Sequence, residues 1–322
     1  MATRTGWALR FAWSMGAILF ALGAAFAEPV RNGFDLAGAL VPVEEILQGG
    51  PPKDGIPAID HPAFVGASDA KDLRPDEKVL AVFRNGIAKA YPISILNWHE
   101  VVNDRFGADP VVVTFCPLCG SGMVFDARTE GRALRFGVSG LLYNSDVLLY
   151  DRETQSLWSQ IRAQAVSGPL KGERLAAIPV LHTTWAEWRA RHRNTLVLSR
   201  KTGIARDYDR DPYAGYEKST ELIFPVRFDA RGFHPKERVL GIVLGGKAKA
   251  YPFVELERGG GEIADTVAGR AVRIRYSREH QSAEALDAKG RPLVATTLFW
   301  FAWAAFHPET EVYRAPRARS GK

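Results

Sequence analysis

A segment that occurs twice restricts the fold of this chain more than any other feature. Residues 77 to 92 read EKVLAVFRNGIAKAYP, and residues 237 to 252 read ERVLGIVLGGKAKAYP, with no gap between the two copies. A second match follows each copy, because the pattern W-x-x-W-x-x-x-H begins at Trp185 and again at Trp300. Recurrence with constant internal spacing indicates one structural unit that is used twice.

Each copy has the pattern of a strand, a turn, a second strand and a short helix. Asn85-Gly86 separates two β-rich runs, which predicts a hairpin. Pro92 suits the first turn of a following helix, and Thr184-x-x-Glu187 predicts a capping box for the helix that carries the first tryptophan pair. Strands outnumber helices. We therefore expect an α+β, mainly β fold made of two pseudo-symmetric repeat units, the second of them shortened.

The N-terminus has the features of a secretory signal. Arg4 and Arg10 precede an apolar stretch over residues 11–26, and small residues before Glu28 predict a cleavage site. An uncleaved membrane anchor is the alternative. The expected organisation is a signal peptide (1–27), an extended arm (28–75), a first repeat unit carrying both cysteines (76–201), a linker (202–232), a second, degenerate repeat unit (233–315) and a basic tail (316–322). We expect an exported protein, periplasmic or extracellular, with no membrane contact beyond the signal segment.

The formal net charge of +6 comes from the two ends of the chain. Two arginines lie in the predicted signal, and four basic residues lie in the final stretch RAPRARSGK, so the body is close to neutral. A nucleic-acid-binding protein would carry a basic face on its folded part. We therefore expect no nucleic-acid partner, and a small molecule or a protein remains the open alternative.

The only two cysteines, Cys116 and Cys119, lie in VVVTFCPLCGSGMVF between two runs that are typical of strands. The sequence CPLCG is similar to the knuckle turn of zinc and iron sites, in which glycine lets the backbone approach the sulfurs. An exported protein can also form a disulfide, although closing so short a loop restrains the unfolded chain little. A redox dithiol is the third possibility, but the following GSGMVF predicts a turn and a strand rather than the helix of thioredoxin-like sites.

Comparison of the two copies separates structural residues from candidate ligands. Residues present in both copies are interpreted as structural, and His192, which matches His307, is among them. Candidate metal ligands are those that the second copy lacks: Cys116, Cys119, His99 and Met123. Two thiolates, an imidazole and a thioether would suit copper, and zinc is the alternative. We expect His99 to lie within side-chain reach of both cysteines, where it could also act as a base for a cysteine nucleophile.

Five further residues are candidates to surround the metal or to contact a substrate. Several lie in YNSDVLLYDRETQSLWSQ, downstream of the cysteines, where the second copy has no counterpart. Another lies in the polar, tyrosine-rich linker TGIARDYDRDPYAGY, which could reach a cleft between the halves. The candidates are Glu100, Asp146, Trp158, Gln160 and Asp207.

Several longer motifs resemble a known family. AKAYPISILNWHEVVND, TFCPLCGSGMVFD, FGVSGLLYNSDVLLYDRETQSLWSQ and TTWAEWRARHRNTLVLSRKTG are similar to the bacterial and archaeal family called domain of unknown function 3179. The resemblance covers nearly all of the chain after the predicted signal. It implies no catalytic residue, because the family has no assigned activity.

The sequence therefore predicts an exported protein with a site for copper or zinc, or a thiol-redox site, built from CPLCG and a histidine. The alternative is a non-catalytic extracytoplasmic binding module with a structural disulfide. Whether the protein is an enzyme stays open.

Overall fold

The computed structural model describes residues 29–228 and 231–316. The predicted signal peptide and all but the first residue of the predicted basic tail lie outside the described residues. Within the described ranges, no helix combines the length and the apolar character needed to cross a lipid bilayer.

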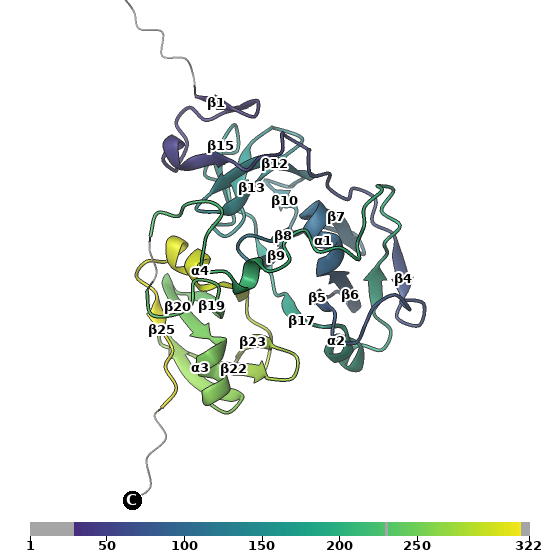
Figure 1. Cartoon of the computed structure of the whole chain (residues 1–322), viewed down its shortest axis with the longest axis vertical. Helices are drawn as coiled ribbons and strands as arrows, with labels where there is room; N and C mark the ends of the chain where they lie inside the picture. The colour runs from purple at the N-terminus through teal and green to yellow at the C-terminus, as the bar shows by residue number, and fades with distance from the viewer. Residues whose placement is uncertain (1–28, 229–230, 317–322) are drawn as a thin grey trace, which may run out of the picture.

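The described chain is mainly β and forms a five-bladed β-propeller (Figure 1). The expectation of an α+β fold with two pseudo-symmetric repeat units is therefore wrong. Alternation of polar and apolar residues identifies strands, but it does not say which consecutive hairpins share a sheet. Here the strands that follow each AKAYP segment leave its sheet and form another one, and residues 136–167 supply most of a fifth sheet.

The five sheets are numbered here as blades. Blade 1 has the order β17-β5-β6-β18-β4, with bounds Leu181–Thr184, Lys78–Arg84, Ile87–Pro92, Leu196–Leu198 and Phe64–Gly66. Blade 2 has the order β16-β9-β8-β7, with bounds Ala177–Ile178, Ser121–Asp126, Asp109–Cys116 and Val101–Phe106. Blade 3 has the order β15-β14-β13-β12-β3, with bounds Gln164–Ser167, Leu157–Ser159, Asp146–Asp151, Phe136–Tyr143 and Ile46–Gln48.

Blades 4 and 5 come from the C-terminal part of the chain. Blade 4 has the order β24-β19-β20-β25, with bounds Thr296–Phe299, Arg238–Leu244, Lys247–Pro252 and Glu311–Val312. Blade 5 has the order β21-β22-β23, with bounds Glu262–Val267, Arg270–Ser277 and Ser282–Asp287. Two small hairpins pair β1 (Val30–Arg31) with β2 (Phe34–Asp35) and β10 (Arg128–Thr129) with β11 (Arg132–Ala133).

The helices are short and lie beside the blades. They are α1 (Ile93–His99), α2 (Trp185–Arg191), α3 (Phe253–Arg258) and α4 (Trp300–Phe306), with the 3-10 turns η1 (Val43–Glu45) and η2 (Tyr216–Lys218). One half of the predicted capping box is present, because Thr184 Oγ1 accepts a hydrogen bond from the backbone N–H of Glu187 at 3.3 Å. The Glu187 carboxylate instead accepts hydrogen bonds from Thr183 Oγ1 and Ser282 Oγ. The predicted hairpin at Asn85-Gly86 is also present, with both residues at positive φ as a type I′ turn requires.

The two AKAYP segments occupy equivalent places in blades 1 and 4. Val79 pairs with Pro92 across β5 and β6, and Val239 pairs with Pro252 in the same register across β19 and β20. A parallel strand, β18 or β25, adds to each. The two Trp–His pairs also match, since ring centroids lie 4.1 Å apart in Trp188–His192 and again in Trp303–His307. These histidines therefore have packing roles.

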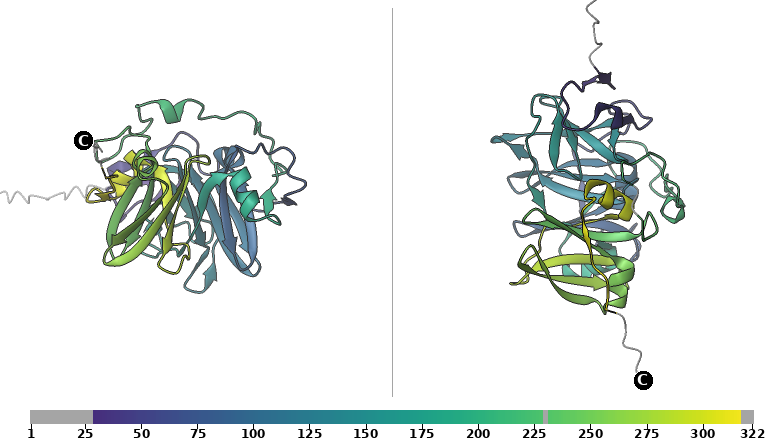
Figure 2. Two further views of the ribbon diagram at one scale, coloured as in Figure 1. Left: turned by 90° about the horizontal axis from the view of Figure 1, so that it is seen from below. Right: turned by 90° about the vertical axis from the view of Figure 1, so that its left-hand side faces the viewer.

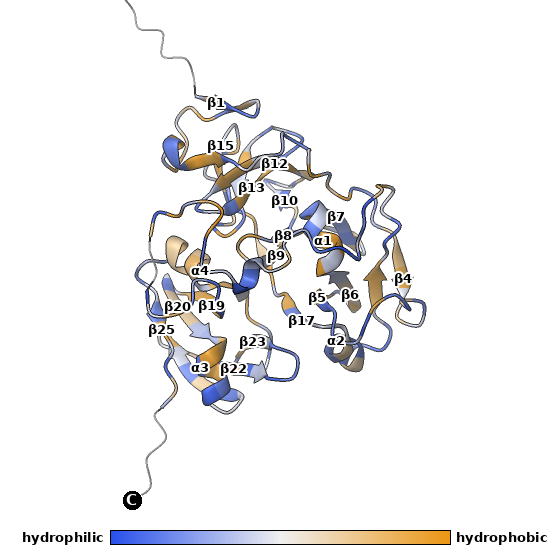
Figure 3. Cartoon of the chain, in the orientation of Figure 1, coloured by the Kyte–Doolittle hydropathy of each residue, from blue (hydrophilic) through white to orange (hydrophobic). Residues whose placement is uncertain are grey.

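Residues 202–228, here called the strap, connect blade 1 to blade 4 across one face of the molecule. Figure 2 shows the strap arching over the sheets, with η2 near its middle. In Figure 3 the sheets carry both hydrophobic and hydrophilic colours, and the short turn η2 of the strap is hydrophilic. Apolar side chains of the strap nevertheless pack against the core cluster that contains both cysteines: Tyr213, Tyr216, Leu222, Phe224 and Val226. The strap thus covers the region where the candidate ligands lie.

Gly241 in β19 tests the packing of blade 4. An added Cβ there would lie 2.2 Å from two ring carbons of Trp303. We expect Gly241→Ala to lower the free energy of unfolding by about 1–3 kcal/mol, because an overpacked core must shift its side chains. Chemical denaturation measures this change. Gly66→Ala in β4 is the control, since its Cβ would meet nothing closer than 3.8 Å. Equal stability of Gly241→Ala and wild type would contradict this packing.

Candidate metal centre

The motif CPLCG forms the turn of the β8–β9 hairpin. Cys116 is the last residue of β8 and pairs with Ser121, so Cys119 lies in the turn between them. Gly120 adopts a left-handed φ of 60°, and an added Cβ would lie 2.9 Å from the ring of Phe299. Glycine is required there for both reasons. The turn therefore packs against Phe299 of blade 4.

A second turn, YNSD, faces the first one from blade 3. It joins β12 to β13 with Asn144 and Ser145 both at positive φ, 50° and 66°. Left-handed conformations of residues other than glycine store strain and cluster at functional sites. The strap secures this turn, because Asn144 Oδ1 accepts a hydrogen bond from Arg227 N at 2.7 Å and Ser145 Oγ donates one to Phe224 O at 3.2 Å.

The two turns bring together three potential metal ligands. The sulfurs of Cys116 and Cys119 and a carboxylate oxygen of Asp146 all lie within 4.8 Å of one another, and all three residues are buried. Both cysteines are free thiols. Each donates toward the Ser145 carbonyl oxygen, Cys116 Sγ at 3.7 Å and Cys119 Sγ at 3.3 Å. From the sequence, Asp146 was expected only to surround the site or contact a substrate. In the structure its carboxylate is one of the three potential ligands.

Asp146 has one carboxylate oxygen without a partner. Oδ2 accepts a hydrogen bond from Ile161 N at 3.1 Å, whereas Oδ1 is buried and has no hydrogen-bond partner among the described residues. Burial raises the pKa of Asp146 to about 8, and the nearby charge of Glu100 contributes to the rise. Burial also raises the pKa of Glu100 to about 8 and raises that of the Cys119 thiol. The surroundings thus disfavour several negative charges here unless a cation neutralises them.

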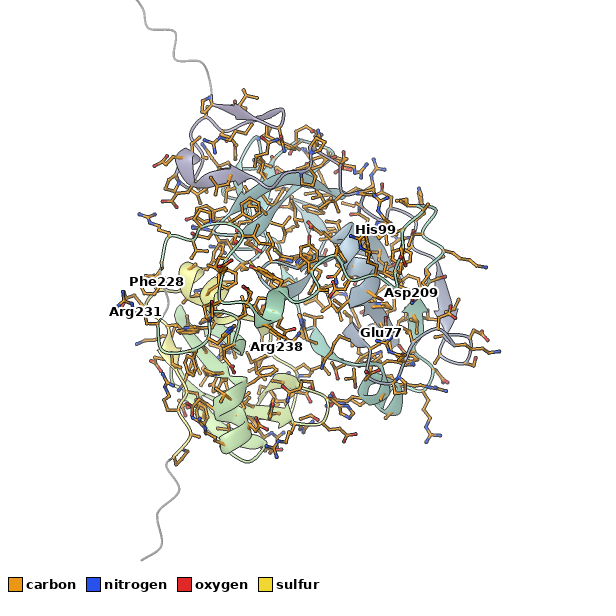
Figure 4. The ribbon with its side chains drawn as sticks, viewed as in Figure 1. Glu77, His99, Asp209, Phe228, Arg231 and Arg238 are labelled. Carbon is orange, nitrogen blue, oxygen red and sulfur yellow. The ribbon has the colours of Figure 1, made fainter. Side chains whose placement is uncertain are left out.

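His99 is not part of this cluster. Its ring nitrogens have other partners: Nδ1 lies 2.7 Å from Pro57 O, and Nε2 lies 2.7 Å from Tyr208 OH. Figure 4 labels His99 on α1, and the cluster of ligand atoms that lie within 4.8 Å of one another does not include it. Its position is explained by the end of the helix, because Glu100 follows with a left-handed φ of 57° and turns the chain into β7. His99 thus anchors the strap through Tyr208.

Met123 and Gln160 support the hairpin that carries the cysteines. Met123 belongs to the same core cluster as both thiols and lines a cavity with Trp303; its role as a ligand stays a prediction. Gln160 Oε1 accepts a hydrogen bond from Ser121 Oγ at 2.6 Å, and its Nε2 donates to Thr114 Oγ1 at 2.8 Å. Gln160 therefore links β8 and β9 beside the turn.

Two predicted neighbours of the site have other roles. Trp158 is buried and donates its Nε1–H to Asp151 Oδ2 at 2.9 Å, a contact within blade 3. Asp207 is exposed and accepts a hydrogen bond from Asp209 N at 3.2 Å within the strap. Tyr208, the next residue along, is the one that turns inward.

Sequence reasoning missed three contributors to the site. Tyr213 and Tyr216 of the strap lie near the thiols. Burial raises the pKa of both phenols, and the charge of Cys116 is a smaller cause of the same rise. Phe299 of blade 4 donates its backbone N–H to Cys119 O at 2.8 Å. The tyrosines could have been suspected from the composition of the linker, whereas a backbone contact from a distant strand leaves no sequence signal.

The fold and the site together define a five-bladed β-propeller with a buried cluster of two cysteines and one aspartate under a covering strap. The chain belongs to the family DUF3179, described as a protein of unknown function, whose model matches residues 53–291. The match includes all three ligand residues and the strap. The comparisons with curated proteins and with solved structures gave no match.

His182 makes the β9–β17 contact sensitive to acid. Its Nε2 lies 3.1 Å from both the N and the O of Gly122, and burial lowers its pKa to about 3. Below about pH 6.5 the unfolded chain binds a proton that the folded protein does not. As the pH falls from 6.5 to 4, we expect His182 to lower the free energy of unfolding by up to ~1.4 kcal/mol per pH unit.

Urea unfolding of metal-free protein across this pH range measures the slope. His182→Gln should remove this contribution, and His61→Gln, at an exposed position, is the matched control for the loss of a histidine. The same slope in wild type and His182→Gln would show that His182 is not held neutral by the fold.

Proposed function

We propose that this protein binds one zinc ion, or a similar thiophilic divalent ion, at Cys116, Cys119 and Asp146. The observation that carries the proposal is the meeting of three buried ligand atoms within 4.8 Å, one of them from a carboxylate that has an oxygen with no partner among the described residues. Sulfurs bound tetrahedrally to zinc lie about 3.8 Å apart, given Zn–S bonds of about 2.3 Å. The cluster therefore needs only a small closure to hold the ion.

The donor set favours zinc over copper. The copper interpretation relied on an imidazole and a thioether beside the two thiolates, because soft ligands select Cu(I). The cluster contains a carboxylate instead, and both nitrogens of His99 already have partners. Zinc accepts thiolate sulfur and carboxylate oxygen in one site.

A fourth ligand position remains open. Three protein ligands with a further position for water or substrate are typical of catalytic zinc sites. The charge of Glu100 contributes to the raised pKa of Asp146, so its carboxylate could interact with a molecule in that position, although it is not one of the three clustered ligands. The site could thus hold either a structural ion with four protein ligands or a catalytic ion whose fourth ligand is water or substrate.

A thiol-redox function is less consistent with the surroundings. Cys116 is 1% exposed and Cys119 is fully buried. Thiol exchange requires an accessible thiolate, whereas burial raises the pKa of Cys119. The alternative of a module with a structural disulfide also has no support here, because both thiols are free. Export through the signal at residues 1–27 stays a prediction.

We expect purified protein to bind one zinc ion per chain, and substitution of a ligand to weaken binding. Cys116→Ser and Cys119→Ser should each lower zinc affinity at least about 100-fold, because a thiolate is lost from a site with few ligands. A competition titration against a chromophoric chelator measures the affinity. His99→Gln is the control and should bind zinc as wild type does. Loss of zinc from His99→Gln with full retention in Cys119→Ser would contradict the proposed ligand set.

Asp146→Asn should separate zinc binding from stability. The amide does not ionise, so the metal-free variant avoids the cost of keeping a buried carboxyl group protonated at neutral pH. It should therefore be more stable than wild type by about 1 kcal/mol or more, while binding zinc more weakly. Asp104→Asn is the matched control. Asp104 is also buried, but it pairs with Lys89 at 2.8 Å and with Tyr91. Its loss should destabilise by roughly 3–5 kcal/mol. Equal destabilisation by both substitutions, measured in urea, would mean that Asp146 has a structural role.

A further inference from the structure

A cleft of about 350 Å³ lies directly outside the CPLCG turn. Blade 1, blade 4 and the strap form its walls, and Pro117 and Gly120 belong to its floor. The lining is partly aromatic and partly basic. The side chains used below are Lys78, Tyr213, Tyr216, Glu217, Arg238 and Phe299. A cavity of this size suits a small ligand.

Two basic residues reach this cleft from equivalent places in the fold. Lys78 is the first residue of β5, and Arg238 is the first residue of β19, where the twice-occurring segments read EKVL and ERVL. The preceding glutamates bind the starts of the neighbouring helices, since Glu77 accepts from Ser94 Oγ and Glu237 accepts from Val254 N. Figure 4 labels Arg238 near η2. Blades 1 and 4 thus each supply one cation to the same cleft.

Among the side chains that line the cleft, Lys78, Lys218 and Arg238 are basic, and Asp211 and Glu217 are acidic. Arg238 pairs with Glu217 of η2 at 2.9 Å. Lys78 has no carboxylate within ion-pair distance among the described residues, and its ammonium donates to the carbonyl oxygen of His280 at 2.7 Å. Burial and then the charge of Arg238 lower the pKa of Lys78 to about 8. An added anion between the two cations would relieve their repulsion.

We propose that this cleft binds a small organic anion. Its carboxylate or phosphate group lies between Lys78 and Arg238, and its apolar part lies against Tyr213, Tyr216 and Phe299. This assignment does not depend on the metal, because neither cation belongs to the metal cluster. Glu217 competes with the ligand for Arg238 and is the internal anion that the ligand replaces.

The ion pair between Arg238 and Glu217 allows a sharp test, because substituting its two members should change ligand affinity in opposite directions. Phenyl phosphate and benzoate are titrated calorimetrically into full-length, metal-free protein at low salt, and the two probes distinguish the anionic groups. Glu217→Gln should tighten binding of the preferred probe about 3–10-fold, because Arg238 becomes free. Arg238→Gln and Lys78→Met should each weaken it at least about 10-fold, since each removes a charge-assisted hydrogen bond.

Tighter binding by Glu217→Gln cannot result from misfolding, so it supports the proposal even if a cation variant fails to fold. Failure of both probes to bind wild type, or unchanged or weaker binding by Glu217→Gln, overturns it. The double variant Cys116→Ser/Cys119→Ser should bind the probe as wild type does. Binding that requires zinc would overturn the assignment to Lys78 and Arg238. A protein that binds the probe but no zinc would contradict only the proposed function.

Discussion

The structure around the site depends on the contact between two hairpin turns from different blades. The CPLCG turn of blade 2 presents two thiols, and the YNSD turn of blade 3 presents the Ser145 carbonyl and the Asp146 carboxylate to them. Both turns contain left-handed residues. Gly120 adopts this conformation without strain, whereas Asn144 and Ser145 are not glycines and depend more on tertiary contacts to hold it. The strap supplies those contacts for YNSD, and Phe299 of blade 4 supplies one for CPLCG.

This arrangement has a cost that a metal ion would remove. Burial favours the protonated form of the Asp146 carboxyl group and of the Cys119 thiol in metal-free protein, and one oxygen of Asp146 has no partner among the described residues. Binding of a divalent cation would replace those protons and satisfy that oxygen, so metal binding and folding free energy would be coupled. A burial pattern that is unfavourable in the metal-free protein is therefore consistent with a site built for an ion.

Local features of the fold could be predicted from the sequence, and the assembly could not. The Asn85-Gly86 hairpin and the helix N-cap at Thr184 follow from turn and helix-end chemistry that acts over a few residues. The sorting of hairpins into five blades depends on packing between segments far apart in the chain. The two-unit expectation failed for that reason, although both AKAYP segments occupy matching places.

The candidate site shows the same division between local and distant signals. Two ligands follow from the spacing of Cys116 and Cys119, and Asp146 was recognised only as a polar residue nearby. His99 is close to the cysteines in sequence, but its ring binds Pro57 and Tyr208. The packing of blade 2 against blade 3 decides that Asp146 rather than His99 lies beside the thiols. No sequence pattern predicts that packing.

X-ray absorption spectroscopy at the zinc edge tests the central claim most directly, because it reads the ligands of the bound ion. The account predicts two sulfur ligands at about 2.3 Å and one or two oxygen ligands at about 2.0–2.2 Å, without the multiple scattering of an imidazole. A spectrum with no sulfur, or one with a clear imidazole contribution, would contradict a site made of Cys116, Cys119 and Asp146.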